Sequence, residues 1–250
     1  MTLAPLGWAR ALLDVVFPPR CVACGAVGAE LCAQCATRIR QPPAPRCARC
    51  DQPLRRGRVS EGIQSADALC LECANGTFAP AVDRMVIGAI YEEPLRAAIL
   101  TFKFKGRRRA ARPLARLAAE AWRAAGLRAD VIVPVPLSRS RQRERGYNQT
   151  DLLARELARA LGAPPRPDAL VRTRATAAQS SLGWNERQRN VAGAFAPGPA
   201  AATLAGRRVL LLDDIITSGA TVQAAASALR QANPAAIYAL AIARPLAPER

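Results

Sequence analysis

Hydrophobic residues follow two alternating patterns over the later two thirds of the chain. Short continuous runs rich in Val, Ile and Leu are typical of strands buried on both faces. Longer stretches with apolar residues at every third or fourth position are typical of amphipathic helices. Their alternation predicts an α/β fold in which helices cover both faces of a parallel sheet. The expected strands are 85–91, 130–135, 207–212 and 236–243, and the expected helices are 92–104, 110–125, 148–161 and 219–231.

Residues 1–80 differ in character, because they show little periodicity, are rich in proline and contain all eight cysteines. This change predicts a small N-terminal module over 1–80 and a larger domain over 81–250, with the boundary near 78–83. Ligands of a parallel sheet bind beyond the carboxyl ends of its strands. The loops that follow Val135 and Leu212 are therefore the expected binding loops.

The eight cysteines form four Cys-x-x-Cys pairs, with none left over. Such a pair directs two thiolates at one metal ion, and two pairs complete a tetrahedral zinc site. A disulfide scaffold would need an oxidising compartment, and the sequence shows no export signal, so we expect two structural zinc sites. The pairs could combine in three ways, and we expect the sequential one because it keeps the connecting loops short. The expected ligands are Cys21, Cys24, Cys32 and Cys35 for one site and Cys47, Cys50, Cys70 and Cys73 for the other.

The charge balance bears on partners, since 36 basic against 19 acidic residues give a net charge of +17. This excess favours anionic partners such as nucleic acid, phosphorylated ligands or an anionic membrane surface. An arginine-rich surface without a dedicated ligand would give the same count. The chain has no histidine, which excludes His general bases, Ser-His and Cys-His nucleophile pairs and His metal ligands.

No apolar run reaches the ~18–20 residues of a transmembrane helix. Residues 1–19 are mildly apolar, include Arg10 and Asp14, and lack a clear cleavage site. We therefore expect a short amphipathic helix there rather than a signal peptide. These features predict a cytoplasmic protein with no transmembrane segment.

The segment 209–221 carries the most specific chemistry in the sequence. A predicted strand ends in two adjacent carboxylates, Asp213 and Asp214, and a turn of small residues leads into a helix near Gly219. Carboxylates can accept hydrogen bonds from a vicinal diol, while a helix N-terminus offers backbone N–H groups to a phosphate. Each piece alone is common in proteins. The full run describes a site for a ribose 5-phosphate.

This run resembles the motif with which type I phosphoribosyltransferases bind 5-phosphoribosyl diphosphate (PRPP). The resemblance implies that Asp213 and Asp214 are the catalytic acids and hold the ribose 2′- and 3′-hydroxyls. It also implies that the turn holds the 5′-phosphate and that Mg²⁺ accompanies the diphosphate. The residues of the phosphate turn are Thr217, Ser218, Gly219, Ala220 and Thr221.

In the same fold family, a loop after an earlier strand takes the diphosphate. The loop after 131–135 supplies Ser138, Arg139 and Arg145 as candidates, since arginine pairs well with phosphate oxygens. Other arginines of this loop are also suitable counter-charges, although some would be solvated or face nucleic acid. The polar, basic segment 172–190 fits either a lid that excludes water or an ordinary surface connection.

The cysteine module and four further segments resemble the ComF family, which combines a zinc-binding module with a phosphoribosyltransferase domain and is tied to natural competence and DNA uptake. The resemblance implies that PRPP or a nucleotide is bound, with single-stranded DNA and other competence proteins as further partners. An active phosphoribosyltransferase of nucleotide or related metabolism, without a DNA role, is the alternative, and the sequence shows no clear element for recognising a base as its acceptor. The segments are Phe102-Lys-Phe-Lys-Gly106, Arg145-Gly-Tyr-Asn-Gln149, Thr176–Asn190 and Asp213–Thr221.

A DNA-binding role would use the basic clusters 103–109 and 139–145. Phe102, Phe104 and Tyr147 are candidates for stacking on bases. Helical spacing predicts instead that Phe102 is buried.

Overall fold

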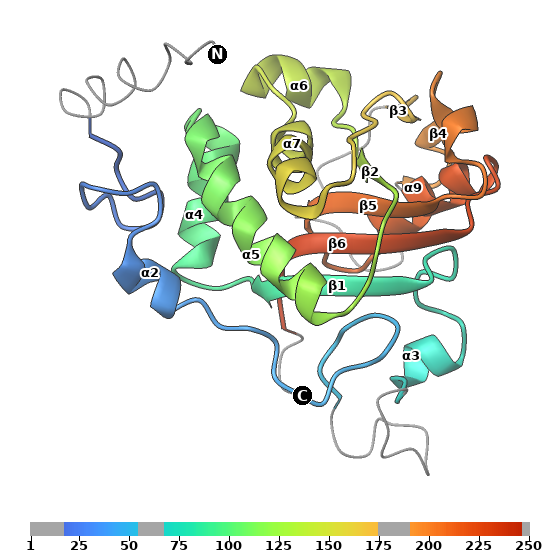
Figure 1. The fold of residues 1–250 in the computed structure, drawn as a ribbon, viewed down its shortest axis with the longest axis horizontal. Helices are drawn as coiled ribbons and strands as arrows, with labels where there is room; N and C mark the ends of the chain where they lie inside the picture. Colours follow the sequence, from blue (N-terminus) through green and yellow to red (C-terminus); the bar gives the residue numbers. More distant parts are fainter. Residues whose placement is uncertain (1–17, 55–67, 175–190, 247–250) are drawn as a thin grey trace, which may run out of the picture.

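The computed structural model describes residues 18–54, 68–174 and 191–246. One sheet of four parallel strands, in the order β1–β6–β5–β2, forms its centre (Figure 1). This is the α/β parallel sheet that the hydrophobic pattern predicts. The strands are β1 (Arg84–Ile90), β2 (Val131–Pro134), β5 (Arg208–Ile215) and β6 (Ala236–Arg244).

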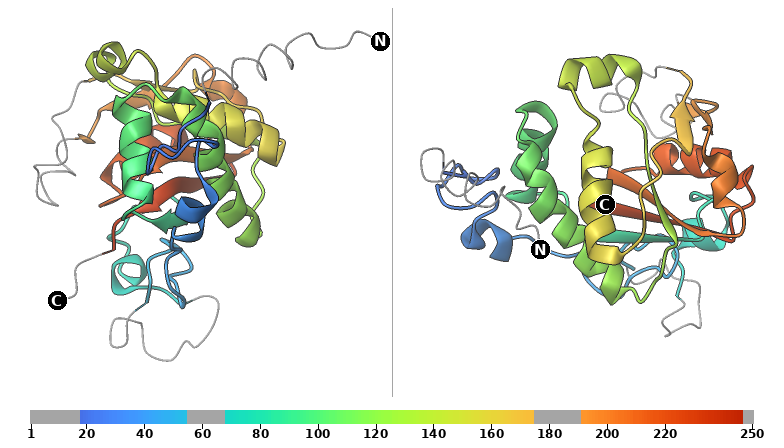
Figure 2. Two further views of the ribbon diagram at one scale, coloured as in Figure 1. Left: turned by 90° about the vertical axis from the view of Figure 1, so that its left-hand side faces the viewer. Right: turned by 45° about the horizontal axis from the view of Figure 1, so that its top comes forward.

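One face of the sheet is covered by three helices, α4 (Leu95–Phe104), α5 (Ala111–Ala124) and α7 (Gln149–Leu161) (Figures 1 and 2). Successive strand residues point to opposite faces, so Leu210 and Leu212 of β5 face this layer. Their apolar partners recur at helical spacing, which is why the sequence pattern locates these helices correctly.

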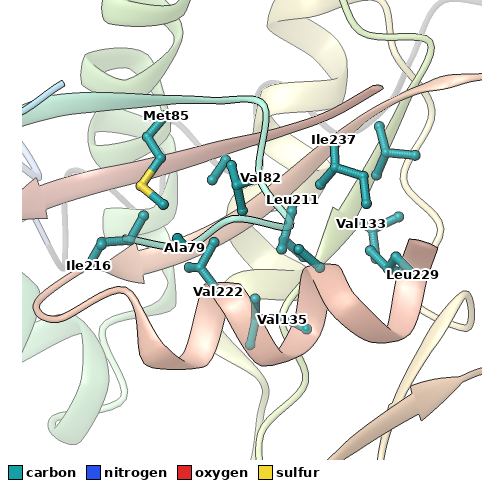
Figure 3. Packing of buried hydrophobic residues seen from close by; sticks show 14 of the residues in the cluster. Ala79, Val82, Met85, Val133, Val135, Leu211, Ile216, Val222, Leu229 and Ile237 are labelled. Atoms are coloured by element: carbon teal, nitrogen blue, oxygen red, sulfur yellow. The ribbon is translucent and has the colours of Figure 1, made fainter. Parts of the chain in front are cut away.

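The opposite face is covered by α9 (Ala220–Arg230) and a hairpin of β3 (Leu170–Arg172) and β4 (Phe195–Pro197). The chain between the cysteine module and β1 joins this layer. Figure 3 shows Ala79 and Val82 of that segment in one cluster with Val222 of α9. The segment therefore packs as part of the core, and the division into domains 1–80 and 81–250 stays a prediction.

The cysteine module contains two short helices, α2 (Ala33–Thr37) and α3 (Leu71–Ala74). Its second half lies along β1, which is an edge strand. The amide of Met85 donates to the carbonyl of Arg49 at 2.6 Å, and the amide of Ile87 donates to Asp51 Oδ2 at 2.7 Å. The module thereby covers an edge that would otherwise present unpaired backbone groups.

Within the larger domain, a helix and a hairpin were not expected from the sequence. Residues Arg139–Arg145 form a helix, α6, which Ser138 caps at its start and Gly146 ends in a left-handed conformation. Its residues are all polar, so it has no hydrophobic periodicity. The β3–β4 hairpin has strands of three residues each, too short to show alternation. Two single turns of 3₁₀ helix, η1 (Arg108–Ala110) and η3 (Ala201–Leu204), complete the described elements.

The helix expected within 1–19 and most of the segment 172–190 lie outside the described residues. Across the described part of the chain, no helix combines the length and apolarity that crossing a bilayer requires.

Candidate functional site

Asp213 and Asp214 lie near the carboxyl end of β5, where neighbouring residues face opposite sides of the sheet. Asp214 faces α4 and α7 and is 4% exposed. Its Oδ1 lies 2.7 Å from Lys103 Nζ, and its Oδ2 accepts a hydrogen bond from Gln149 Nε2 at 2.7 Å. Donors from two helices thus fix the position of this carboxylate.

Asp213 has a different environment. Its Oδ1 accepts a hydrogen bond from the Asp214 amide at 2.8 Å. Burial and the neighbouring Asp214 carboxylate raise the pKa of Asp213 to about 7, while Lys103 and Arg172 oppose this rise. Near neutral pH, Asp213 is therefore able to accept a hydrogen bond from a ligand hydroxyl or to donate one.

The turn after β5 leads into the N-terminus of α9 and leaves room there for an anion. Gly219 adopts φ = +77°, a conformation that side chains disfavour. A small cavity of about 20 Å³ lies at this point, lined by residues that include Asp213, Thr217, Gly219 and Thr221. The positive end of the helix dipole and the amides of the first turn suit a phosphate there.

A larger cavity of about 260 Å³ adjoins the same carboxylates. Its wall combines the two acids with the hydroxyls of Thr217 and Thr221. Four cationic side chains also line it, twice the number of carboxylates, so the cavity favours an anion. These cations are Lys103, Arg141, Arg145 and Arg172.

Arg145 is held in position by neighbouring side chains. Its guanidinium donates to Gln149 Oε1 at 2.9 Å and lies over the Phe104 ring, 4.7 Å from the centroid. Burial lowers its pKa. Its Nε is buried without a hydrogen-bond partner among the described residues. An anionic ligand in the cavity would offset the cost of burying this charge.

The structure brings together some of the predicted site residues and leaves others aside. Asp213, Asp214, Thr217, Thr221 and Arg145 all line the larger cavity. Ser218 is buried, and its Oγ lies 3.5 Å from the amide nitrogen of Ala220. Ser138 instead caps α6, and Arg139 is exposed away from the described cavity wall.

Sequence reasoning missed three cavity residues as ligand-site residues. Lys103 was assigned to a DNA path, and Gln149 appeared only as the last residue of a family motif. Arg172 belongs to the β3–β4 hairpin, which the sequence did not reveal. Arg141 was one of the loop arginines that suit a diphosphate, and it does line the cavity. Their convergence depends on tertiary packing of α4, α6, α7 and β3, which no local pattern encodes.

The structure confirms the burial predicted for Phe102 and corrects one candidate stacking residue, Tyr147. Phe102 is fully buried, in agreement with its helical spacing, and Tyr147 is 8% exposed. The Tyr147 hydroxyl donates to the Phe102 carbonyl, and Arg108 covers its ring at 4.9 Å. Neither ring can stack on a base, because each is packed inside the domain. Phe104 remains exposed, at 60%.

The cysteines form two groups in sequential pairing, as predicted. In each group the four sulfur atoms lie within 4.8 Å of one another. The Sγ atoms of Cys24 and Cys32 are 3.7 Å apart, and those of Cys50 and Cys70 are 3.6 Å apart. Zn–S bonds of about 2.3 Å in a tetrahedron place sulfurs about 3.8 Å apart. The geometry therefore fits zinc.

The two cysteine groups differ in their surroundings. We call Cys21–Cys35 the first cluster and Cys47–Cys73 the second cluster. All four cysteines of the second cluster are buried, whereas Cys24 of the first cluster is exposed and Cys32 is half-buried. In each cluster one backbone amide lies 3.4 Å from a thiol sulfur, as is usual around zinc thiolates.

Comparison with known proteins agrees with this arrangement. Residues 12–74 match the family described as a double zinc ribbon domain, and residues 107–249 match the phosphoribosyl transferase domain. The fold and the site thus define a protein with a zinc-ribbon module and a phosphoribosyltransferase domain.

Similar proteins show which family with this combination of domains the chain belongs to. Competence protein F of Haemophilus influenzae is 37% identical over 170 residues, covering 66% of this chain and 74% of the relative. DNA utilization protein YhgH of Salmonella typhimurium is 32% identical over 221 residues, covering 86% and 91%. The chain belongs to the ComF family, whose motifs it carries.

Among solved structures, the allosteric regulatory enzyme of purine biosynthesis is 18% identical, with a TM-score of 0.38. The similarity covers 57% of this chain and 30% of that one.

Proposed function

We propose that the site binds PRPP or a related 5-phosphoribosyl ligand. The observation that carries this proposal is the position of the two carboxylates. Asp213 lines both the small cavity at the phosphate turn and the larger cavity, and Asp214 lines the larger cavity together with its four cations. A ribose diol would meet the carboxylates, the 5′-phosphate would meet the N-terminus of α9, and the diphosphate would meet the cations.

Mg²⁺ would enter with the diphosphate. Carboxylate oxygens are ligands that Mg²⁺ prefers, and Asp213 and Asp214 are the acidic residues on the described cavity wall. Bound there, the ion would neutralise diphosphate charge, while the arginines orient the same group.

Whether the site transfers the phosphoribosyl group depends on an acceptor. Transfer would break the bond between ribose C1 and the diphosphate and form one to a nucleophile. The described cavity wall offers carboxylates, hydroxyls, cations and apolar side chains, and its neutral amide, Gln149, is already held by Asp214 and Arg145. The apolar residues are Val135, Pro136, Leu137 and Ile215. Ligand binding in a competence protein is the function that we propose. Active transfer in nucleotide metabolism is the alternative.

A second observation favours a role with DNA. A groove of about 780 Å³ runs beside α5 and α7 and is lined by more basic than acidic residues. Arg109, Arg112, Arg116 and Arg123 recur at intervals of three, four and seven residues. They form a row about 20 Å long at 1.5 Å per residue. Such a row suits the backbone of single-stranded DNA.

We therefore propose that the protein acts in natural competence or DNA uptake, as the names of its relatives suggest. We also propose a cytoplasmic location. Zinc sites made of four thiolates need reduced cysteines, which the cytoplasm maintains. Other competence proteins are the expected protein partners.

Calorimetric titration with PRPP and Mg²⁺ tests the ligand assignment. We expect Asp213→Asn combined with Asp214→Asn to weaken binding at least about 100-fold, because hydrogen bonds to charged groups contribute about 1.5–3 kcal/mol each. Asp168→Asn is the control, since Asp168 is exposed and is not one of the residues that line the cavity. Equal affinity of the double variant and the wild type would refute the site.

Diphosphate release separates the two functions. The wild type is incubated with PRPP and a panel of bases and amines. Release that depends on one of these compounds supports the transferase alternative. Tight PRPP binding without any release supports the binding protein.

A further inference from the structure

Phe78 occupies an unusual position directly beneath the phosphate turn. It follows α3 of the second cluster closely, and its amide donates to the carbonyl of Glu72 at 3.2 Å. A Cβ atom placed on Gly219 would lie 2.9 Å from Cζ of the Phe78 ring and 3.3 Å from Cε2. The far edge of the ring therefore rests against the backbone at the start of α9.

The same ring is held from another side by Arg244, at the end of β6. The guanidinium carbon lies 4.9 Å from the ring centroid. Arg244 is 9% exposed and donates to the carbonyl of Cys50 at 2.9 Å. Cys50 belongs to the second cluster. A continuous path of contacts thus joins a candidate zinc ligand to the phosphate turn.

The chain beyond Phe78 is also fastened to α9. The amide of Ala81 donates to Gln223 Oε1 at 2.9 Å, and Arg230 Nε donates to the carbonyl of Ala81 at 3.1 Å. Arg230 further pairs with Asp83 at 2.7 Å. These contacts fasten the segment that follows Phe78 to α9. They therefore help to keep the Phe78 ring against the backbone of Gly219.

We infer that Phe78 is a positioning residue for the phosphate turn and that the second cluster acts on ligand binding through it. The inference rests on the proposed phosphoribosyl site. The ring fills the space that the missing side chain of Gly219 leaves, so it fixes the backbone amides that would face the phosphate. Folding of the second cluster around its metal sets the ring in place through Arg244 and the Cys50 carbonyl.

The test compares two truncations in the full-length, zinc-loaded protein. Phe78→Ala removes the ring, and Val82→Ala is the matched control. Val82 is 1% exposed and belongs to the same hydrophobic core as Phe78, but none of its atoms is among those nearest to Gly219. Phe78→Leu, which keeps part of the apolar volume, guards against a variant that fails to fold.

Three quantities are measured for each variant: the Kd for PRPP with Mg²⁺, the zinc content, and hydrogen exchange at the amides of 216–221 without ligand. We expect Phe78→Ala to weaken PRPP binding about tenfold or more and to speed exchange, because small displacements of a binding group are costly. Phe78→Leu should be intermediate. Val82→Ala should keep the Kd within about twofold, and all variants should retain zinc.

Hydrogen exchange keeps this test independent of the ligand assignment. If the wild type does not bind PRPP but Phe78→Ala still loosens 216–221 selectively, the proposed function fails and the positioning role stands. If Phe78→Ala and Val82→Ala change exchange and affinity equally, Phe78 is an ordinary core residue and the inference is overturned.

Discussion

Asp213 and Asp214 are neighbours in sequence but have opposite tasks. Asp214 already accepts from Lys103 and Gln149, each at 2.7 Å, so its carboxylate is fixed in position between α4 and α7. Asp213 accepts a hydrogen bond from the Asp214 amide, and its pKa is raised to about 7 by burial and by Asp214. The adaptable partner for a ligand hydroxyl is therefore Asp213.

This difference predicts a pH dependence. A diol donor is best received by ionised Asp213, whose ionised fraction rises about tenfold between pH 6 and pH 8 for a pKa of about 7. PRPP affinity of the wild type should rise by up to that factor beyond the change caused by the ligand's own phosphates. Calorimetry on Asp213→Asn supplies the baseline, and parallel slopes for both proteins would contradict the prediction.

The same carboxyl affects the stability of the free protein. Its pKa is higher in the folded state than the ordinary value of 3.8, so the folded state holds the proton more tightly. Stability from this group is therefore lost as pH rises from about 4 to about 7. Bound ligand should reduce the loss, because its hydroxyls stabilise the ionised form.

Single residues also show where sequence reasoning succeeds. Asp213, Asp214, Thr217 and Thr221 are adjacent in one run, so their shared chemistry is visible in the sequence. Lys103 lies more than 100 residues away and meets Asp214 only after α4 packs on the sheet. A distant partner of this kind is set by tertiary contacts.

At the scale of elements, predictability follows hydrophobic periodicity. The strands and helices that bury an apolar face were located from the sequence within a few residues. β5 extends to Ile215, three residues beyond the expected end, because pairing with β6 continues to Ala243. α6 escaped prediction because a helix of seven polar residues buries no face.

The two cysteine clusters predict two phases of zinc loss. A chelator should strip the first cluster sooner, since Cys24 is exposed, and with little effect on the larger domain. Loss from the buried second cluster should cost several kcal/mol and loosen β1 and α9, because metal binding is coupled to folding. Zinc release measured together with thermal unfolding follows both phases.

Serine variants of single cysteines show which cluster gives rise to each phase of zinc loss. Cys24→Ser should remove the fast phase and leave the melting temperature nearly unchanged, while Cys70→Ser should lower it markedly. A single phase in which both ions leave together would contradict this difference between the clusters.

At the scale of the molecule, many of the basic residues behind the net charge of +17 are gathered at two places. Four cations serve the ligand cavity, and others line the groove beside α5. The basic cluster 103–109 is thus divided, with Lys103 in the cavity and Arg108 and Arg109 at the groove. The groove is therefore the more extended surface for a polyanion.

This division predicts which arginines bind DNA. Arg112→Glu with Arg116→Glu should lower affinity for single-stranded DNA at least about tenfold at low salt and make its salt dependence shallower, because phosphate contacts release counterions. Arg128→Glu with Arg207→Glu changes the net charge equally at exposed positions outside the groove. Fluorescence anisotropy across a salt series compares the pairs. Equal losses would mean that only total charge matters.

The cover that the second cluster gives to β1 has a consequence for synthesis of the chain. β1 ends at Ile90, but its sheet neighbour β6 begins only at Ala236. At ~5–20 residues per second, β6 follows on the order of 10 s later. Cys73 emerges before β1, so the cluster could load its metal and shield one edge of this strand on the ribosome. In a cell short of zinc, newly made chains would then aggregate during synthesis. This loss would come before mature molecules stopped binding their ligand.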